Sequence, residues 1–250
     1  MCPIFLKFRE FYQKHTNIKI KFSMSIKNQF TKYAKDYDDN NIIQRIVSKA
    51  IVREITDKPK NILELGCGSG QIFREIHWEF ESYKAIDFSN TMCELHPKAH
   101  NLIVKCFNFD TKSFLDEIEG DSYDLILSSS ALQWSTNLPQ LVQNILPKTK
   151  KFKAVLFASN TFKEIYAITK KEKSILSLEE IQGAFSPYGA CFEVFEYKLY
   201  FENKKELFDY IKNSGVSGEN TLSFREAKEL YKKYQLDYLS FEVVFVTVSH

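Results

Sequence analysis

The stretch NILELGCGSG, residues 61–70, places three glycines within five positions directly behind a short apolar run. The whole chain of 250 residues holds only eight glycines, so this concentration needs a physical reason. Glycine is favoured where the backbone takes a positive φ or must come very close to another group. A glycine turn between a strand and a helix can form a binding site, because main-chain N–H groups and the helix end then face a ligand.

Two acidic residues stand where they could complete such a site. Glu64 lies two positions before the first glycine, and Asp87 ends the apolar segment YKAID. A carboxylate at the end of a second parallel strand can accept hydrogen bonds from both hydroxyls of a ribose. The alternative for Asp87 is a structural role, in which it caps the next helix together with Ser89. We favour the ribose role.

The segments that must position these residues alternate between strand-like and helix-like patterns. Strand-like runs lie at 61–65, 83–87, 102–107, 123–130 and 153–159. Between them lie helix-like runs at 71–80, 90–99 and 138–146, and a turn or short helix at 112–119. This alternation predicts an α/β fold with parallel core strands and helices on both faces. Helix-like runs follow at 177–185, 204–215 and 224–234. Strand-like runs at 191–201 and 239–250 predict an antiparallel C-terminal hairpin on the edge of the same sheet.

The N-terminal part divides at Met24. Residues 1–23 match no clear period, and we interpret them as a poorly patterned extension; the alternative is an amphipathic first helix. Residues 24–250 are predicted to form one domain. The pattern from Ile26 to Ile55 is helical, is interrupted by the polar residues 38–41, and ends before Pro59.

The composition excludes several classes of protein. A hydrophobic content of 44% and a net charge of +2 are ordinary for a globular chain and argue against a dedicated nucleic-acid binder. The five cysteines are scattered, without metal-type spacing, so we expect no metal site and a cytoplasmic location. No apolar run approaches the roughly 20 residues needed to span a bilayer, so we expect no membrane association.

The order Glu64-x-Gly66-x-Gly68-x-Gly70 resembles the first motif of the class I S-adenosylmethionine-dependent methyltransferases. Gln71 stands where the dinucleotide fingerprint requires its last glycine, which disfavours a nicotinamide-dependent dehydrogenase. The resemblance implies a Rossmann-like methyltransferase sheet with S-adenosyl-L-methionine as cofactor. In that family the turn touches the amino-acid part of the cofactor, and the acidic residue helps to hold the turn and the methionine end.

The same resemblance implies further cofactor contacts. Family members usually place a polar residue near the adenine after the third strand, where both Asn108 and Asp110 qualify; we slightly favour Asp110. An N-terminal lid helix of the form F-x-x-x-A-x-x-Y is matched by Phe30, Ala34 and Tyr37, although core packing is the better interpretation of Phe30. The predicted cofactor-binding residues are Tyr33, Glu64, Gly66, Cys67, Gly68, Gly70, Asp87, Phe88, Asn108, Phe109, Asp110 and Ser129.

The segment ALQW, residues 131–134, resembles the malonyl-acyl-carrier-protein O-methyltransferases that start biotin synthesis. The resemblance covers about residues 26–250, although Ser129-Ser130 replaces the Ser-Asn that relatives often show. It implies methyl transfer to the free carboxylate of a malonyl thioester. A carboxylate is already ionised at neutral pH, so we expect no general base. Gln133, Trp134 and Tyr37 are predicted to position the substrate; the alternative for Trp134 is a hydrophobic wall.

An acidic carrier protein would need a basic docking surface. We expect the lysine-rich run at 148–153 to be a solvated turn at the amino end of the sheet, and KKEK at 170–173 is the better docking candidate. His77, His96 and His100 are expected at the surface. We expect a monomer without a nucleic-acid partner. The alternatives are a methyltransferase for another small acid, such as aconitate, and a cofactor-binding protein without catalysis.

Overall fold

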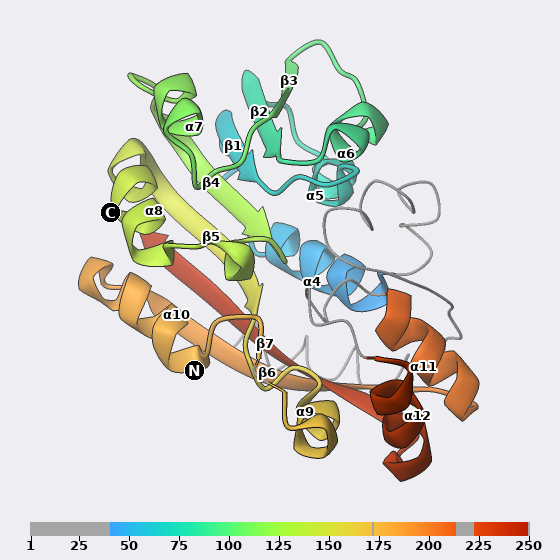
Figure 1. Ribbon diagram of the computed structural model, residues 1–250. Coiled ribbons are helices and arrows are strands. Elements are labelled where there is room, and N and C mark those ends of the chain that lie inside the picture. The colour runs from blue at the N-terminus through green and yellow to red at the C-terminus, as the bar shows by residue number, and fades with distance from the viewer. Residues whose placement is uncertain (1–40, 172, 214–222, 250) are drawn as a thin grey trace.

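The computed structural model describes residues 41–171, 173–213 and 223–249, which form a seven-stranded sheet with helices on both faces (Figure 1). The strand order is β3-β2-β1-β4-β5-β7-β6. Strand β7 is antiparallel to both of its neighbours, and the pairings from β3 to β5 are parallel. The predicted α/β sheet with a parallel core and an antiparallel C-terminal hairpin is therefore confirmed.

The strands are β1 (Asn61–Leu65), β2 (Ser82–Asp87), β3 (Leu102–Cys106), β4 (Tyr123–Ser129), β5 (Thr149–Phe157), β6 (Cys191–Tyr200) and β7 (Tyr238–Ser249). The α-helices are α4 (Ile42–Arg53), α5 (Gln71–Glu75), α6 (Asn90–Leu95), α7 (Lys112–Glu117), α8 (Leu138–Ile145), α9 (Lys163–Thr169), α10 (Leu178–Phe185), α11 (Lys204–Asn213) and α12 (Phe224–Lys233). Short 3-10 helices are η1 (Leu132–Trp134), η2 (Leu146–Lys148) and η3 (Ser186–Tyr188).

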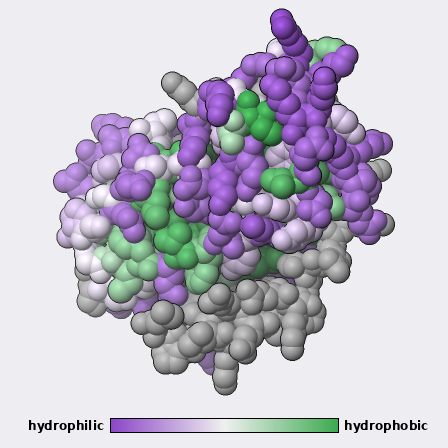
Figure 2. All heavy atoms as spheres, turned by 90° about the horizontal axis from the view of Figure 1, so that it is seen from below, coloured by the Kyte–Doolittle hydropathy of each residue, from purple (hydrophilic) through white to green (hydrophobic). Residues whose placement is uncertain are grey.

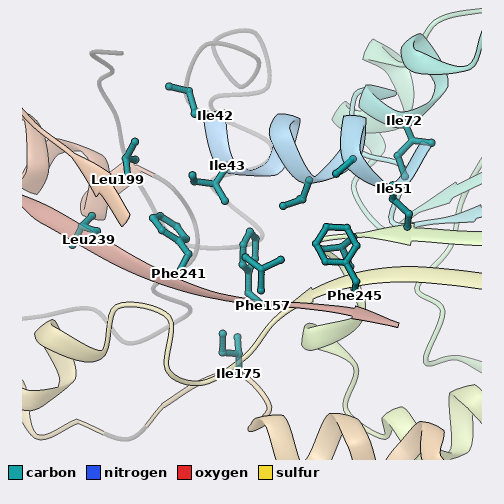
Figure 3. Packing of buried hydrophobic residues seen from close by; sticks show 14 of the residues in the cluster. Ile42, Ile43, Ile51, Ile72, Phe157, Ile175, Leu199, Leu239, Phe241 and Phe245 are labelled. Atoms are coloured by element: carbon teal, nitrogen blue, oxygen red, sulfur yellow. The ribbon is translucent and has the colours of Figure 1, made fainter. Parts of the chain in front are cut away.

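Helix α4 covers one face of the sheet. Its isoleucines recur at helical spacing, and Figure 3 shows Ile43 and Ile51 pointing from α4 toward Phe157 of β5 and Phe245 of β7. Fully burying such a side chain contributes about 1.5–3 kcal/mol. The residues of a second cluster come from the opposite face of the sheet and from α7, α8 and α10. The sheet is thus buried on both sides, as expected for parallel strands.

The structure differs from the predicted elements at several places; helix α6, for example, ends at Leu95 rather than near residue 99. Helix α5 ends at Glu75 rather than near residue 80, because the following segment turns back and the Trp78 indole N–H donates to the Pro59 carbonyl oxygen at 3.0 Å. Strand β5 begins at Thr149, so the lysine-rich run lies largely within a strand and is not a turn. Helix α9 was not predicted, because the segment after β5 has no long apolar period.

Residues 1–40 lie outside the described part of the chain, and with them the predicted extension at 1–23 and the predicted lid residues Phe30, Tyr33, Ala34 and Tyr37. Across the described residues, no helix combines the length and the apolar content that crossing a membrane requires. On the face shown in Figure 2, hydrophilic side chains predominate and hydrophobic ones form smaller patches.

Candidate functional site

The glycine turn after β1 uses the conformation that only glycine adopts freely. Gly66, Gly68 and Gly70 have φ angles of 73°, 51° and 90°. The N–H groups of Gly66 and Cys67 donate to the Ile86 carbonyl oxygen at 2.8 and 3.0 Å, so the turn is tied to the end of β2. A side chain at any of the three positions would be strained.

The three glycines differ in what surrounds them. A Cβ atom on Gly66 would lie 2.1 Å from the Cβ atom of Ala131, and one on Gly70 would lie 2.6 Å from Cδ of Pro97. A Cβ atom on Gly68 would meet no described atom within 4 Å. Gly66 and Gly70 are therefore needed for packing inside the protein, whereas no described residue occupies the space in front of Gly68, where a ligand could lie.

Glu64 lies beneath this turn and is 2% exposed. Its Oε2 accepts a hydrogen bond of 2.5 Å from the hydroxyl of Tyr83. Burial raises the pKa of Glu64 to about 8; the Tyr83 hydrogen bond opposes this shift and the charge of Asp87 adds to it. A cation bound above the turn would favour the ionised form of this carboxyl group.

Asp87 links the turn to the next helix. Its Oδ2 accepts a hydrogen bond from the Gly68 N–H at 2.9 Å, and its Oδ1 accepts one from the Ser89 N–H at 2.9 Å. Ser89 is the N-cap of α6, with its hydroxyl oxygen accepting from the Met92 N–H. Burial raises the pKa of Asp87, and these backbone hydrogen bonds oppose the shift. Asp87 therefore supports the cap, and each carboxylate oxygen keeps lone-pair capacity for a further donor.

The end of β4 forms the opposite side of the site. Ser130 has a positive φ of 58° directly after the strand, and its N–H donates to the Val155 carbonyl oxygen at 2.8 Å. Such strain in a residue other than glycine is concentrated at functional sites. Gln133 is 3% exposed, and its Nε2 donates to the Ser130 carbonyl oxygen at 2.8 Å. Ser129 Oγ accepts from Ser48 Oγ at 3.0 Å, which joins β4 to α4.

A narrow cleft opens between α4, the glycine turn and the end of β4. Its described lining is Gln44, Ser48, Glu64, Gly66, Cys67, Gly68, Ser69, Gln71, Ile72, Ser129 and Ser130. Three buried polar atoms of this lining have no hydrogen-bond partner among the described residues: Gln44 Oε1, Gln71 Nε2 and Ser130 Oγ. An unpaired buried polar group costs about 1–3 kcal/mol, so a ligand with donors and acceptors would stabilise this arrangement.

The cleft continues into a hollow with positive charge. Ser48 and Gln71 line both spaces, and the hollow is completed by Arg45, Lys49 and Arg74 together with Glu75. Lys49 forms an ion pair with Glu75 at 3.3 Å. Among the described residues that line the hollow, three are cationic and one is acidic, which favours an anionic group beside the glycine turn.

Four further predicted cofactor-binding residues follow β2 and β3: Phe88, Asn108, Phe109 and Asp110. Phe88 is 37% exposed beside Asp87, while Asn108 is exposed and Phe109 is half-buried. Asp110 clamps the loop before α8: its Oδ1 accepts from the Ser135 hydroxyl at 2.6 Å, and its Oδ2 accepts from the Thr136 N–H at 2.7 Å. The roles of Asn108 and Asp110 toward adenine stay predictions.

Gln133 and Trp134, the predicted substrate residues that the structure describes, are not part of the described lining of the cleft. Trp134 is half-buried and packs against the cluster beneath α4. Gln133 closes the turn after β4 through its amide, as described above. Their roles in positioning a substrate stay predictions. Of the histidines, His77 and His100 are exposed as expected, but His96 is only 3% exposed because it packs against Phe73.

The two lysine-rich segments have different surroundings. Lys150 pairs with Asp124 at 2.6 Å, and Lys153 pairs with Glu54 at 2.9 Å, at the amino end of β5 and away from the cleft. In the segment 170–173, Lys171 pairs with Glu226 at 3.3 Å, and Lys173 donates to Asn160 Oδ1 at 3.0 Å. This second segment follows the carboxyl end of β5 in the chain, and the cleft lies at the carboxyl ends of β1 and β4.

Six described residues of the cleft lining were missed from the sequence: Gln44, Ser48, Ser69, Gln71, Ile72 and Ser130. Gln44 and Ser48 stand four residues apart on α4, and Gln71 and Ser130 flank the two turns. A signal was present for the first two, because they are polar residues one helical turn apart beside the apolar positions of α4. No sequence pattern indicates that Ser130 takes a positive φ.

Comparison with known proteins gives consistent results. Residues 63–151 match the model of a methyltransferase domain family. A malonyl-[acyl-carrier protein] O-methyltransferase of Calditerrivibrio nitroreducens is 24% identical over 90% of this chain and 96% of the relative. Proteins of the same name from Bacillus cereus and Acinetobacter baylyi are 23% and 26% identical over 89% and 87% of this chain, and over 93% and 88% of their own lengths.

Solved structures share the fold at lower identity. The YcgJ protein from Bacillus subtilis is 12% identical, with a TM-score of 0.59 over 82% of this chain and 98% of its own. The plantazolicin methyltransferase BpumL, solved in complex with SAH, is 14% identical, with a TM-score of 0.52 over 90% of this chain and 95% of its own. The arrangement of strands and helices is therefore one that known methyltransferases also adopt.

Proposed function

Because this chain is a class I S-adenosylmethionine-dependent methyltransferase, we propose that it methylates the free carboxylate of a malonyl thioester carried by an acyl carrier protein. One observation carries the proposal: relatives named for this reaction match most of this chain and nearly the whole of their own lengths. The similarity therefore includes the parts outside the cofactor-binding half. The ALQW segment supports the same conclusion, since it stands at the carboxyl end of β4, where open α/β sheets bind ligands.

The residues of the cleft fit S-adenosylmethionine. When bound, the cofactor supplies an electrophilic methyl group on a sulfonium. We assign the open space beside Gly68 to its amino-acid part, where Gln44 Oε1, Gln71 Nε2 and Ser130 Oγ offer an acceptor, a donor and a hydroxyl group. The carboxyl group of Glu64 favours the positive charge of the sulfonium, and the Asp87 carboxylate has capacity to accept hydrogen bonds from both ribose hydroxyls.

The acceptor needs orientation more than activation. A malonyl carboxylate is ionised at neutral pH, so no side chain has to remove a proton. Glu64 is unsuited to that task in any case, because it is buried under the turn and bonded to Tyr83. The contribution of Gln133, Trp134 and Tyr37 is then to align the carboxylate oxygen with the methyl group and to exclude water.

The surroundings of the cleft suit an anionic acceptor and an acidic carrier. The hollow with Arg45, Lys49 and Arg74 offers positive charge to the carboxylates of the acceptor and the cofactor. The segment 170–173 is the proposed docking site for the carrier protein. We further propose that the protein acts as a cytoplasmic monomer, without nucleic acid, at the start of the pimeloyl part of biotin synthesis.

Steady-state kinetics with labelled S-adenosylmethionine test the proposal. The expected result is a kcat/KM for malonyl-acyl carrier protein well above that for malonyl-coenzyme A or for a free acid such as aconitate. Lys150→Ala lies near the amino end of β5, away from the proposed docking segment 170–173, and should have the same kcat/KM for malonyl-acyl carrier protein as the wild type. A higher kcat/KM for aconitate would overturn the proposal in favour of a methyltransferase for small free acids.

A further inference from the structure

Two thiols meet at the ends of β2 and β3, next to the site. Cys93 lies on α6, and its Sγ donates to the Asp87 carbonyl oxygen at 3.6 Å and to the Lys105 carbonyl oxygen at 3.7 Å. Cys106 ends β3, and its Sγ donates to the Phe88 carbonyl oxygen at 3.4 Å. Asp87 pairs with Cys106 in the β2–β3 register, so the Cys93 thiol lies against the main chain of the residue beside Cys106 and of the residue before it. Figure 1 shows α6 packed beside β2 and β3.

The four described cysteines differ in their access to solvent. Cys106 is exposed, Cys93 is half-buried, and Cys67, within the glycine turn, is 3% exposed. Cys191 is exposed on β6, at the opposite edge of the sheet from β3. The structure therefore offers one pair of adjacent thiols with an accessible member, and one exposed thiol remote from the site that can serve as a control.

We propose that Cys93 and Cys106 form a reversible disulfide when a peroxide oxidises the protein, and that this disulfide weakens cofactor binding. The peroxide first converts the exposed Cys106 thiol to a sulfenic acid and is reduced to water. The Cys93 sulfur then attacks the Cys106 sulfur, and the sulfenic oxygen leaves as a second water with the thiol proton. Two thiols and one hydrogen peroxide thus give one disulfide and two waters. A dithiol restores both cysteines by exchange.

The order of the two steps follows from the surroundings of the thiols. Burial raises the pKa of Cys93 to about 12, and the neighbouring charges of Asp87 and Cys106 act in the same direction. A thiol that stays protonated is a poor first nucleophile toward peroxide. Cys106 is exposed and lies within reach of Cys93, so it takes the first step and Cys93 resolves the product.

The disulfide acts on the residues that are predicted to hold the adenosine. Each thiol donates its hydrogen to a main-chain oxygen of Asp87 or Phe88, and both donors are lost on oxidation. Ser89 caps α6 and its N–H also holds the Asp87 carboxylate, so drawing α6 toward β3 moves this carboxylate. The coupling uses the cofactor site alone and is independent of the methyl acceptor.

The test compares the full chain before and after treatment with hydrogen peroxide. We expect peptide mapping to show a Cys93–Cys106 cross-link, and calorimetry to show SAH bound at least about fivefold more weakly, with recovery after a dithiol. Cys191→Ser should respond like the wild type. Cys93→Ser and Cys106→Ser should each lose the response, and their thermal melting reports whether they are folded.

Reciprocity gives a second readout on the unmodified protein. If the disulfide opposes cofactor binding, saturating SAH must lower the equilibrium constant for forming the cross-link in a thiol–disulfide buffer by the same factor. Absence of the Cys93–Cys106 cross-link overturns the proposal, and so does a cross-linked protein that binds SAH as tightly as the reduced one. A failure to methylate malonyl-acyl carrier protein leaves both readouts unaffected, so the two proposals fail separately.

Discussion

Alanine substitutions at three glycines separate backbone strain from steric packing and from ligand binding. Gly68 has a φ of 51° and Gly120 has a φ of 79°, and a Cβ atom on either meets no described atom within 4 Å. A side chain in this left-handed region costs about 1–2 kcal/mol, and the lower entropy of the unfolded alanine chain returns about 0.4–1 kcal/mol. We therefore expect Gly68→Ala and Gly120→Ala to lower the free energy of unfolding equally, by about 1 kcal/mol.

Gly66→Ala should cost much more. Its Cβ atom would lie 2.1 Å from the Cβ atom of Ala131, whereas carbon atoms in contact stay about 3.5–4.0 Å apart. The turn or the segment after β4 must move by more than an ångström, and overpacking of this kind adds about 1–3 kcal/mol to the backbone strain. The expected loss in the free energy of unfolding is about 3 kcal/mol, measured by urea denaturation.

Ligand binding distinguishes Gly68→Ala from Gly120→Ala, the two variants that are expected to have equal stability. The methyl group of Gly68→Ala enters the space that we assign to the cofactor, so SAH should bind at least about tenfold more weakly, which is about 1.4 kcal/mol. Gly120→Ala should bind SAH like the wild type, because it lies after α7 and outside the lining of the cleft. Wild-type affinity for SAH in Gly68→Ala would refute the placement of the cofactor beside the turn.

Three further predictions concern carboxyl groups. Glu64 has a pKa of about 8 in the folded protein against an ordinary value of 4.5, so the native state binds more protons than the unfolded state between these pH values. The free energy of unfolding should therefore fall as the pH rises from 4.5 to about 8, and urea titrations of Glu64→Gln should show a smaller dependence on pH. Asp87→Ala should weaken SAH binding at least about tenfold in calorimetry and Asp87→Asn should weaken it less; equal affinities would contradict the ribose role. Asp110→Ala should lower the free energy of unfolding by about 1–3 kcal/mol, whereas Asp116→Ala, at an exposed position, should lower it by about 0.5 kcal/mol or less. Equal losses in chemical denaturation would show that the hydrogen bonds of Asp110 to Ser135 and Thr136 do not stabilise the fold.

Most of the sheet could be predicted from the sequence because each core strand is a short apolar run with its own boundaries. The run NILEL predicts both ends of β1 correctly, since a polar residue precedes it and a glycine follows it. The amino end of β5 could not be predicted in this way. Its first residues are Thr149 and lysines, and their charges are satisfied by Asp124, Asp57 and Glu54 from distant parts of the chain.

The site was predictable where local chemistry restricts the residue type. Glycines with positive φ follow from what the turn requires, and an acidic residue at the end of β2 is what the predicted ribose contact would require. Ser130 and Gln44 were not predictable, because their roles depend on how α4 lies against the end of β4. His96 was misjudged for the same reason: it is buried by contact with Phe73 of α5, a residue that a sequence pattern does not bring close.

The mass of the carrier protein after reaction tests the central claim most directly. Malonyl-acyl carrier protein is incubated with this enzyme and S-adenosylmethionine, and acetyl-acyl carrier protein, which has no free carboxylate, serves as the control. We predict that the malonyl carrier gains the mass of one methyl group as a methyl ester, and that the acetyl carrier gains nothing. An unchanged malonyl carrier, in the presence of tight SAH binding by the same preparation, would contradict the proposed acceptor.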